Sequence, residues 1–153
     1  MRWHPRVTVA AVIRDSKGRY LLVEEQPDGE LVLNQPAGHL ENGESLLEAV
    51  VREVREETCR EFSPHALLGI YRWRASAGGD TFLRFCFLGE AGPINADLVR
   101  DPDILATHWL SPEELDGGPH TLRSPLVSRS IRDAERGQSF PLDLLVELTP
   151  AHA

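Results

Sequence analysis

The sequence predicts an α/β (α+β) sandwich in which helices cover a mixed sheet. Short apolar and β-branched runs are separated by turn residues, which is typical of strands. Two segments carry apolar residues at helical spacing, and the strands and helices do not alternate strictly. At 153 residues the chain fits one core, so we expect residues 1–153 to form a single domain.

The N-terminal third is expected to contain a hairpin followed by a short third strand. Residues 7–13 are β-branched and apolar, and residues 20–24 return as the second strand after a turn at residues 15–18. Residues 31–33 form the third strand. The polar residues 38–44 that follow are expected to form a loop.

The strongest helix signal of the sequence begins at Ser45. Ser45 and Glu48 have the S-x-x-E spacing of a capping box, which places the helix start at Ser45. On a helical wheel one arc is apolar and should face the core. This arc consists of Leu47, Val50, Val51 and Val54.

The rest of the chain is expected to alternate between strands and helices. Residues 67–73 and 81–88 are typical of strands, and residues 107–110 form another strand. That strand leads into a short helix at residues 112–115. A second substantial helix covers residues 125–136, with apolar residues at helical spacing.

The helix after Ser45 also carries an acidic arc. Glu53 and Glu57 are neighbours at i,i+4, Glu56 lies beside them, and Ala49 sits in the same arc one turn earlier, leaving room above the backbone. Clustered like charges near a helix C-terminus are unfavourable, and Arg52 offsets them only in part. Such local inconsistency is typical of functional sites, and hard divalent cations would resolve it. The alternative is a solvated, charge-laced helix face.

Composition narrows the classes of function. The net charge of −8 argues against nucleic-acid binding and fits a site that needs a cation to hold phosphates. Lys17 is the only lysine, which excludes a GxxxxGK[ST] phosphate loop. Cys59 and Cys86 are too few for a disulfide scaffold, and neither a signal peptide nor a membrane-spanning run is present. We expect a cytoplasmic protein with no membrane or nucleic-acid partner.

A longer pattern surrounds the acidic arc and resembles a known signature. Seven residues have the spacing Gx5Ex7REUxEE, which resembles the Nudix box (residues 38–60): Gly38, Glu44, Arg52, Glu53, Val54, Glu56 and Glu57. Further segments resemble the NudJ-type phosphatases of this superfamily, among them residues 34–41, 83–85, 122–127 and 137–142. The resemblance implies a Nudix-type αβα sandwich and a hydrolase of phosphoanhydride bonds.

The resemblance also implies an activity. NudJ-type enzymes hydrolyse nucleoside tri- and diphosphates and thiamine-related pyrimidine diphosphates with magnesium, and release orthophosphate; Mn²⁺ is expected to substitute. Two alternatives stay open. One is a Nudix pyrophosphohydrolase that yields a nucleoside monophosphate and pyrophosphate or splits an X-linked diphosphate. The other is a catalytically silent domain that senses a nucleotide. The partner is in each case a small molecule, and we expect a monomer or a homodimer.

The same resemblance assigns roles to residues of the box. Glu53, Glu56 and Glu57 are expected to bind Mg²⁺, with a backbone carbonyl of Ala37 or Gly38 as a further ligand. Arg52 is counted with the catalytic residues because it would orient the carboxylates, together with the loop residue Glu44. The general base stays open. The candidates are Glu53, Glu57 and two aspartates from a later loop, Asp101 and Asp103.

The sequence also offers candidate substrate contacts, and the end of its box differs from the usual Nudix pattern. Residues that could line the pocket are Arg84, Gln35, His39, Arg123 and Ser124, and either Trp73 or Phe85 could stack on a base ring. The box normally ends in glycine and an aliphatic residue, whereas this chain has Cys59 and Arg60. Glycine there suits a left-handed helix cap, so Cys59 would cost roughly 1 kcal/mol in that conformation unless the helix runs longer.

Overall fold

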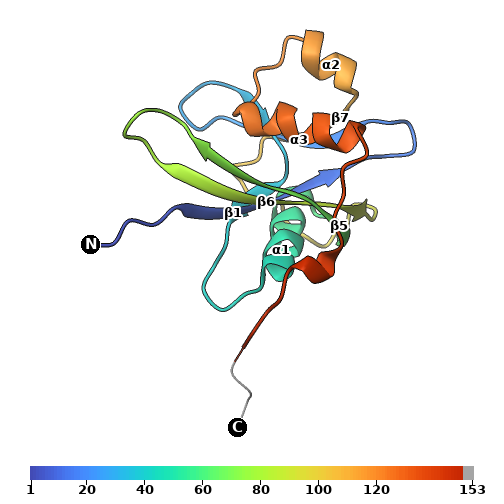
Figure 1. Cartoon of the computed structure of the whole chain (residues 1–153). Helices are drawn as coiled ribbons and strands as arrows, with labels where there is room; N and C mark the ends of the chain where they lie inside the picture. Colours follow the sequence, from blue (N-terminus) through green and yellow to red (C-terminus); the bar gives the residue numbers. More distant parts are fainter. Residues whose placement is uncertain (150–153) are drawn as a thin grey trace.

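A computed structural model, which describes residues 1–149, arranges the chain as two sheets between helices. In Figure 1, α1 and the short helix η1 lie on one side of the strands, and α2 and α3 lie on the other. The strands are β1 (Arg6–Ile13), β2 (Tyr20–Glu25), β3 (Val32–Asn34), β4 (Ala37–His39), β5 (Phe62–Arg74), β6 (Thr81–Ala91) and β7 (Ala106–Leu110). The helices are α1 (Leu46–Thr58), α2 (Pro112–Gly117), α3 (Pro125–Glu135) and η1 (Leu142–Leu144). The expected mixed α/β class is confirmed.

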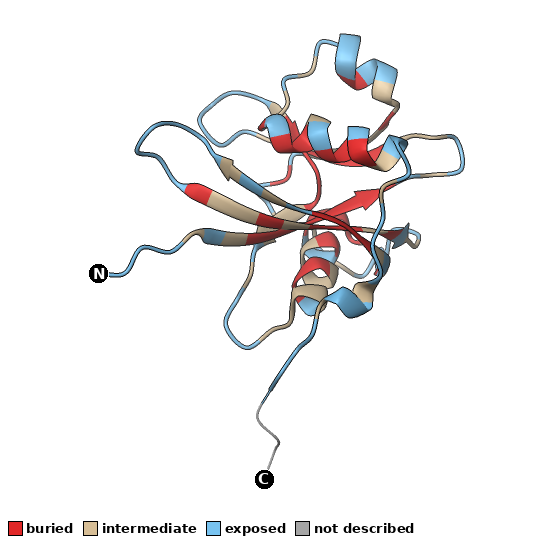
Figure 2. Ribbon diagram, viewed as in Figure 1, coloured by how far each residue is buried: buried red, intermediate tan, exposed pale blue. Residues whose placement is uncertain are grey.

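The larger sheet has the strand order β4-β1-β6-β5, and the smaller one has the order β3-β2-β7. β1 and β6 run parallel, while every other pair is antiparallel. Successive side chains of β1 point to opposite faces. Val9 and Ala11 therefore pack with α1, whereas Ala10 and Val12 pack with Val127 of α3. Figure 2 shows this burial along the central strands and the inner side of α3.

The segment expected to be a polar loop begins with a strand. Ala37, Gly38 and His39 form β4, which pairs antiparallel with β1. The outer edge of β1 carries unpaired peptide groups that these three residues satisfy. The prediction of a loop from Gly38 was therefore wrong for its first two residues.

Two other strands are longer than expected. β5 begins at Phe62 and continues past irregularities in its pairing with β6 on either side of Ala66. Such bulges let a strand continue through Pro64, which cannot donate a ladder hydrogen bond. β6 likewise extends to Ala91. Residues of the β5–β6 hairpin line much of the cavity described below.

Helix α1 begins as predicted. Ser45 is its N-cap and exchanges hydrogen bonds with Glu48 in a capping box. Ala49, which was expected to sit in the acidic arc, is instead fully buried in the core with Val50 and Val54. Its small side chain lets α1 approach the sheet closely, so the core covers a wider arc of the helix than the apolar residues alone indicate.

Among residues 1–149, no helix combines the length and the apolar character needed to cross a membrane.

Candidate active site

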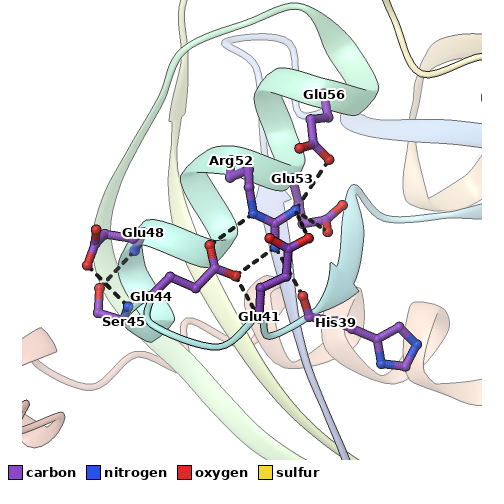
Figure 3. A network of polar contacts seen from close by, with 8 residues as sticks. All are labelled: His39, Glu41, Glu44, Ser45, Glu48, Arg52, Glu53 and Glu56. Atoms are coloured by element: carbon purple, nitrogen blue, oxygen red, sulfur yellow. Dashed lines mark hydrogen bonds and ion pairs between the residues drawn. The ribbon is translucent and has the colours of Figure 1, made fainter.

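Arg52 is the centre of a network that joins α1 to the loop before it (Figure 3). Its guanidinium donates two hydrogen bonds to Glu44, from Nε to Oε2 at 2.9 Å and from Nη2 to Oε1 at 2.7 Å. Nη1 also contacts Glu53 at 2.9 Å and Glu56 at 3.3 Å, and Nη2 donates to the carbonyl of His39 at 3.1 Å. One arginine thus fixes two of the predicted acidic residues relative to the loop.

Charge pairing in this network shifts the pKa of its members. The Arg52 hydrogen bonds hold the pKa of Glu44 below its ordinary value, and Glu44 in turn raises the pKa of Arg52. Burial raises the pKa of Glu53, and Arg52 opposes that shift. The predicted orienting role of Arg52 and Glu44 is consistent with this geometry.

The three glutamates of α1 differ in exposure. The Glu56 side chain is 48% exposed, the Glu53 side chain is 12% exposed, and Glu57 is buried. Glu53 lies directly against Gly38 of β4, so closely that a β-carbon there would fall 2.1 Å from Glu53 Oε1. Glycine is therefore the residue that gives this carboxylate its place between α1 and β4.

Glu57 is a buried acid whose carboxylate accepts a single hydrogen bond from the part of the chain that the structure describes. The backbone N–H of Ala37 donates to its Oε1 at 2.7 Å. Burial, together with the nearby carboxylates of Glu53, Glu25 and Asp101, raises the pKa of Glu57 to about 9, although the hydrogen bond from the Ala37 amide opposes the shift. A buried carboxylate among other carboxylates is stabilised as an anion by a nearby cation.

The carboxylates of Glu53, Glu56 and Glu57 nevertheless do not converge on one point. In the part of the chain that the structure describes, no three His, Cys, Asp or Glu side chains converge as metal ligands. Arg52 holds Glu53 and Glu56, whereas the Ala37 amide holds Glu57. The donors themselves fit a hard divalent cation, which prefers carboxylate and carbonyl oxygens and would relieve their mutual repulsion.

The pairing of β4 with β1 determines which of the two predicted carbonyl ligands, that of Ala37 or that of Gly38, faces away from β1. Pro36 and Leu40, on either side of Gly38, are hydrogen-bonded to β1 at 2.9 and 3.1 Å. Since antiparallel hydrogen bonds join alternate residue pairs, the peptide groups of Gly38 also face β1, and those of Ala37 and His39 face away. The Ala37 carbonyl is thus the better placed of the two for a ligand beside α1.

Asp101 and Asp103, the two aspartates of the later loop, differ in their position relative to the acidic cluster. The Asp101 N–H donates to the Glu56 carbonyl at 2.8 Å, and the Asp101 carboxylate contributes to the raised pKa of Glu57. Asp103 is exposed, and its N–H donates to Asp101 Oδ1 at 2.9 Å. The fold therefore brings Asp101 to the acidic cluster and leaves Asp103 at its outer side.

A cavity of about 520 Å³ lies beside β4 on the α3 face of the larger sheet. Of the predicted substrate contacts, it includes Arg84, His39, Arg123 and Ser124. Arg123 forms an ion pair with Glu25 at 2.7 Å, and Ser124 is the N-cap of α3. Gln35 is not part of the cavity wall, because it is buried behind Arg84. The geometry therefore does not favour the predicted direct contact between Gln35 and the substrate.

The aromatic wall of the cavity is formed by two stacked rings. Trp73 lines the cavity and stacks on Phe82, with ring centroids 5.7 Å apart. Phe85, the other aromatic candidate, packs against the core on the α1 face. Sequence reasoning missed Phe82, although strand alternation from Arg84 places it on the same face. It also missed Glu25, which lines the cavity at the end of β2.

A larger cavity of about 790 Å³ lies between β5 and α3. It shares Trp73 and Leu126 with the first cavity, and neither cavity is lined by Glu53, Glu56 or Glu57. The site is therefore identified by the residues that touch these carboxylates and not by cavity size. The smaller cavity adjoins Ala37 and Gly38, and so lies next to the acidic cluster.

Comparisons with known proteins agree with one another. The sequence profile of the NUDIX domain family matches residues 4–131. The phosphatase NudJ of Escherichia coli strain K12 is 42% identical over 141 residues, which cover 92% of this chain and 90% of that relative. A NUDIX hydrolase structure from Nitrosomonas europaea superposes with a TM-score of 0.89 at 45% identity, covering 95% of this chain and 98% of that one.

More distant structures share the fold alone. The NUDIX domain of Shewanella oneidensis NrtR, solved in complex with ADP ribose, has a TM-score of 0.69 at 16% identity and covers 88% of this chain and 90% of that one.

Proposed function

The chain belongs to the NUDIX family of hydrolases that act on phosphorus-containing anhydrides, and we propose that it is a magnesium-dependent phosphatase. Its proposed substrates are nucleoside tri- and diphosphates and related thiamine-type pyrimidine diphosphates, from which it would release orthophosphate. The observation that carries the proposal is the carboxylate cluster of Glu53, Glu56 and Glu57 beside a cavity that contains a buried arginine. The 42% identity to a NudJ phosphatase supports the choice of product.

The proposed site divides its tasks among three elements. Helix α1 would hold the divalent cation through Glu53, Glu56 and Glu57, with the carbonyl of Ala37 from β4. When bound, the ion supplies neutralisation of phosphate oxygens and lowers the pKa of water. Arg52 keeps the carboxylates oriented, as second-sphere residues generally do for metal ligands. Strand β6 offers Arg84 to a substrate phosphate.

Proton transfer from the attacking water requires a general base near the scissile bond, and this site offers carboxylates. Glu53 and Glu57 are both candidates, and Asp101 joins them because its loop lies against the end of α1. Asp103 is the weaker late-loop candidate, since it is exposed.

Two alternative functions are compatible with the same fold. A pyrophosphohydrolase would use the same carboxylates but cleave the chain of phosphates at another position. A nucleotide sensor is favoured by the fold shared with the NrtR domain that was solved with ADP ribose. A sensor does not need the complete set of acidic residues that this chain has in α1.

The test is incubation of the full chain with nucleoside tri- and diphosphates in Mg²⁺, with orthophosphate and pyrophosphate measured separately. We expect orthophosphate, its loss in chelator, and a drop of several orders of magnitude in kcat for Glu53→Gln and Glu57→Gln. Glu61→Gln is the matched control, because Glu61 is exposed and its carboxylate pairs with Arg55 at the surface, away from the acidic cluster. Pyrophosphate as the only product would select the pyrophosphohydrolase, and no turnover with tight binding would select the sensor.

A further inference from the structure

Two buried polar atoms without hydrogen-bond partners lie at the wall of the same cavity. They are Oγ1 of Thr8 and Nε of Arg84, and neither finds a partner among the described residues. Thr8 is 4% exposed and Arg84 is 7% exposed. The two residues are opposite each other in register across β1 and β6, so their side chains lie on the same face of the sheet. Unpaired buried donors are costly and rare in folded proteins, and the other two in the described residues, on Arg60 and His108, do not belong to this cavity.

A chain of hydrogen bonds fixes the orientation of the Arg84 side chain. The Ser130 hydroxyl donates to the Leu126 carbonyl at 2.7 Å and accepts from the Gln35 side-chain amide. Because the amide nitrogen of Gln35 is used in this way, its oxygen faces Arg84 and accepts from Nη1 at 3.2 Å. This chain runs from α3 to β6. It occupies Nη1 of the guanidinium and leaves the buried Nε, in a residue that lines the cavity, without a partner.

Arg84 also lacks a carboxylate partner within residues 1–149. Glu25 and Glu57 are near enough to act on it electrostatically, but neither is within ion-pair distance. The nearest hydrogen-bond acceptor, Gln35, is neutral. Burial of a guanidinium without an anion is unfavourable, so the arrangement is suited to an anionic ligand with oxygen acceptors. A phosphoryl group meets both requirements, since it accepts from an arginine fork and from a hydroxyl at once.

We propose that Thr8 and Arg84 form an oxyanion subsite for the phosphoryl oxygens of the substrate, and that Gln35, held by Ser130, is its positioning residue. The subsite lies on the α3 face of the sheet, whereas the carboxylates of Glu53, Glu56 and Glu57 belong to α1 on the other side of β4. The subsite depends on the proposed function in one respect: its ligand must carry phosphate. It adds an affinity determinant that does not depend on the divalent cation.

The test measures binding of inorganic diphosphate to the full chain in excess chelator, by calorimetry and by the ¹⁵N resonances of arginine Nε. Thr8→Val keeps the shape of the side chain, and we expect it to weaken binding about fivefold; Arg84→Lys should weaken it by roughly tenfold or more. Thr8→Ser keeps the hydroxyl and should restore most of the affinity. Thr107→Val on β7, outside the cavity, is the control and should bind as the wild type does.

The positioning role of Gln35 and Ser130 has its own readout. Ser130→Ala and Gln35→Leu should raise KM several-fold with little change in kcat, and the Arg84 Nε resonance should lose its response to diphosphate. Ser128→Ala is the control for Ser130→Ala, because Ser128 is a half-buried serine on the same helix whose hydroxyl donates to the Pro125 carbonyl and not to this chain. A purely structural role would lower the melting temperature without separating KM from kcat.

The outcomes for the subsite and for the proposed function are distinguishable. Wild-type diphosphate binding by Thr8→Val and by Arg84→Lys would overturn the subsite, even if the enzyme releases orthophosphate. Diphosphate binding that follows these variants would support the subsite, even if substrate assays gave pyrophosphate or no turnover. Thermal melting of each variant identifies any that fails to fold, in which case Thr8→Ser against Thr8→Val decides.

Discussion

Gly38 of β4 and Glu53 of α1 touch so closely that no side chain fits between them. A β-carbon on Gly38 would lie 2.1 Å from Glu53 Oε1 and 2.2 Å from its carboxyl carbon. The backbone of Gly38 is not in the left-handed region, so glycine is needed here for the contact and not for its backbone conformation. The first glycine of the box is therefore explained by the position of a single carboxylate.

Gly38→Ala should move the Glu53 carboxylate and lower activity with little effect on folding. Because the methyl group would overlap the carboxylate, Glu53 must rotate away from its position beside β4. We expect kcat to fall at least tenfold at saturating Mg²⁺, with the cation concentration for half-maximal rate increased. Steady-state kinetics over a Mg²⁺ titration measures both.

Gly117→Ala is the matched control, since a β-carbon there meets nothing within 4 Å. Unchanged kinetics in Gly38→Ala would mean that Glu53 does not act from the position seen here.

Arg52→Lys should cost both stability and activity. A lysine keeps the charge but cannot make the two-pronged contact with Glu44 while also holding Glu53 and the His39 carbonyl. We expect the free energy of unfolding to fall by about 1–3 kcal/mol, in line with hydrogen bonds between charged groups. Denaturant unfolding and kcat measured on the same preparation provide the test.

The same helix supplies a control for this substitution. Arg55 makes a similar two-pronged contact with Glu61, but both side chains are about half exposed. Exposed ion pairs contribute about 0–1 kcal/mol, so Arg55→Lys should have little effect on stability and none on kcat. Equal losses in the two variants would argue against a special role for Arg52.

Glu44 should make stability depend on acid pH. Its hydrogen bonds from Arg52 keep its pKa lower in the folded chain than in the unfolded one. The stabilising contribution is therefore complete above the unfolded pKa, roughly 4.3, and is lost as the pH falls through the lower folded pKa. Glu44→Gln should lower the unfolding free energy at pH 7 and flatten its fall between about pH 5 and pH 3.

Urea unfolding at several pH values measures that slope. A variant that retained the wild-type slope would place the acid sensitivity in other carboxylates, such as Asp15 or Asp133, whose pKa values are also lowered.

Local sequence signals predicted the helix that carries the acidic residues. The capping box at Ser45 placed the start of α1, because both of its hydrogen bonds are made within four residues. The i,i+4 spacing likewise put Glu53 and Glu57 side by side, since helical geometry alone decides it. Signals of this kind require no knowledge of the rest of the fold.

Features that depend on distant partners were not visible in the sequence. The strand β4 exists because β1 needs a neighbour, and the burial of Ala49 follows from how closely α1 packs. Gln35 looked like a substrate contact, yet its partners Ser130 and Arg84 lie 95 and 49 residues away in the chain. Of the two possibilities left open at Cys59, the structure has the left-handed cap, with φ 58° and ψ 30°, and not a longer helix.

At Cys59 the positive φ of the backbone lowers the stability of the fold, whereas burial of the side chain raises it. It is the only residue with positive φ, apart from glycines, in the described part of the chain, and its side chain is buried, with Sγ 3.7 Å from the Leu98 carbonyl. Cys59→Ala removes the thiol and keeps the strain, whereas Cys59→Gly removes both. We expect the glycine variant to be more stable than the alanine variant by about 1 kcal/mol, the cost of a β-carbon in this conformation. Chemical denaturation of the two variants side by side isolates the backbone contribution, and an alanine variant as stable as the glycine variant would contradict it.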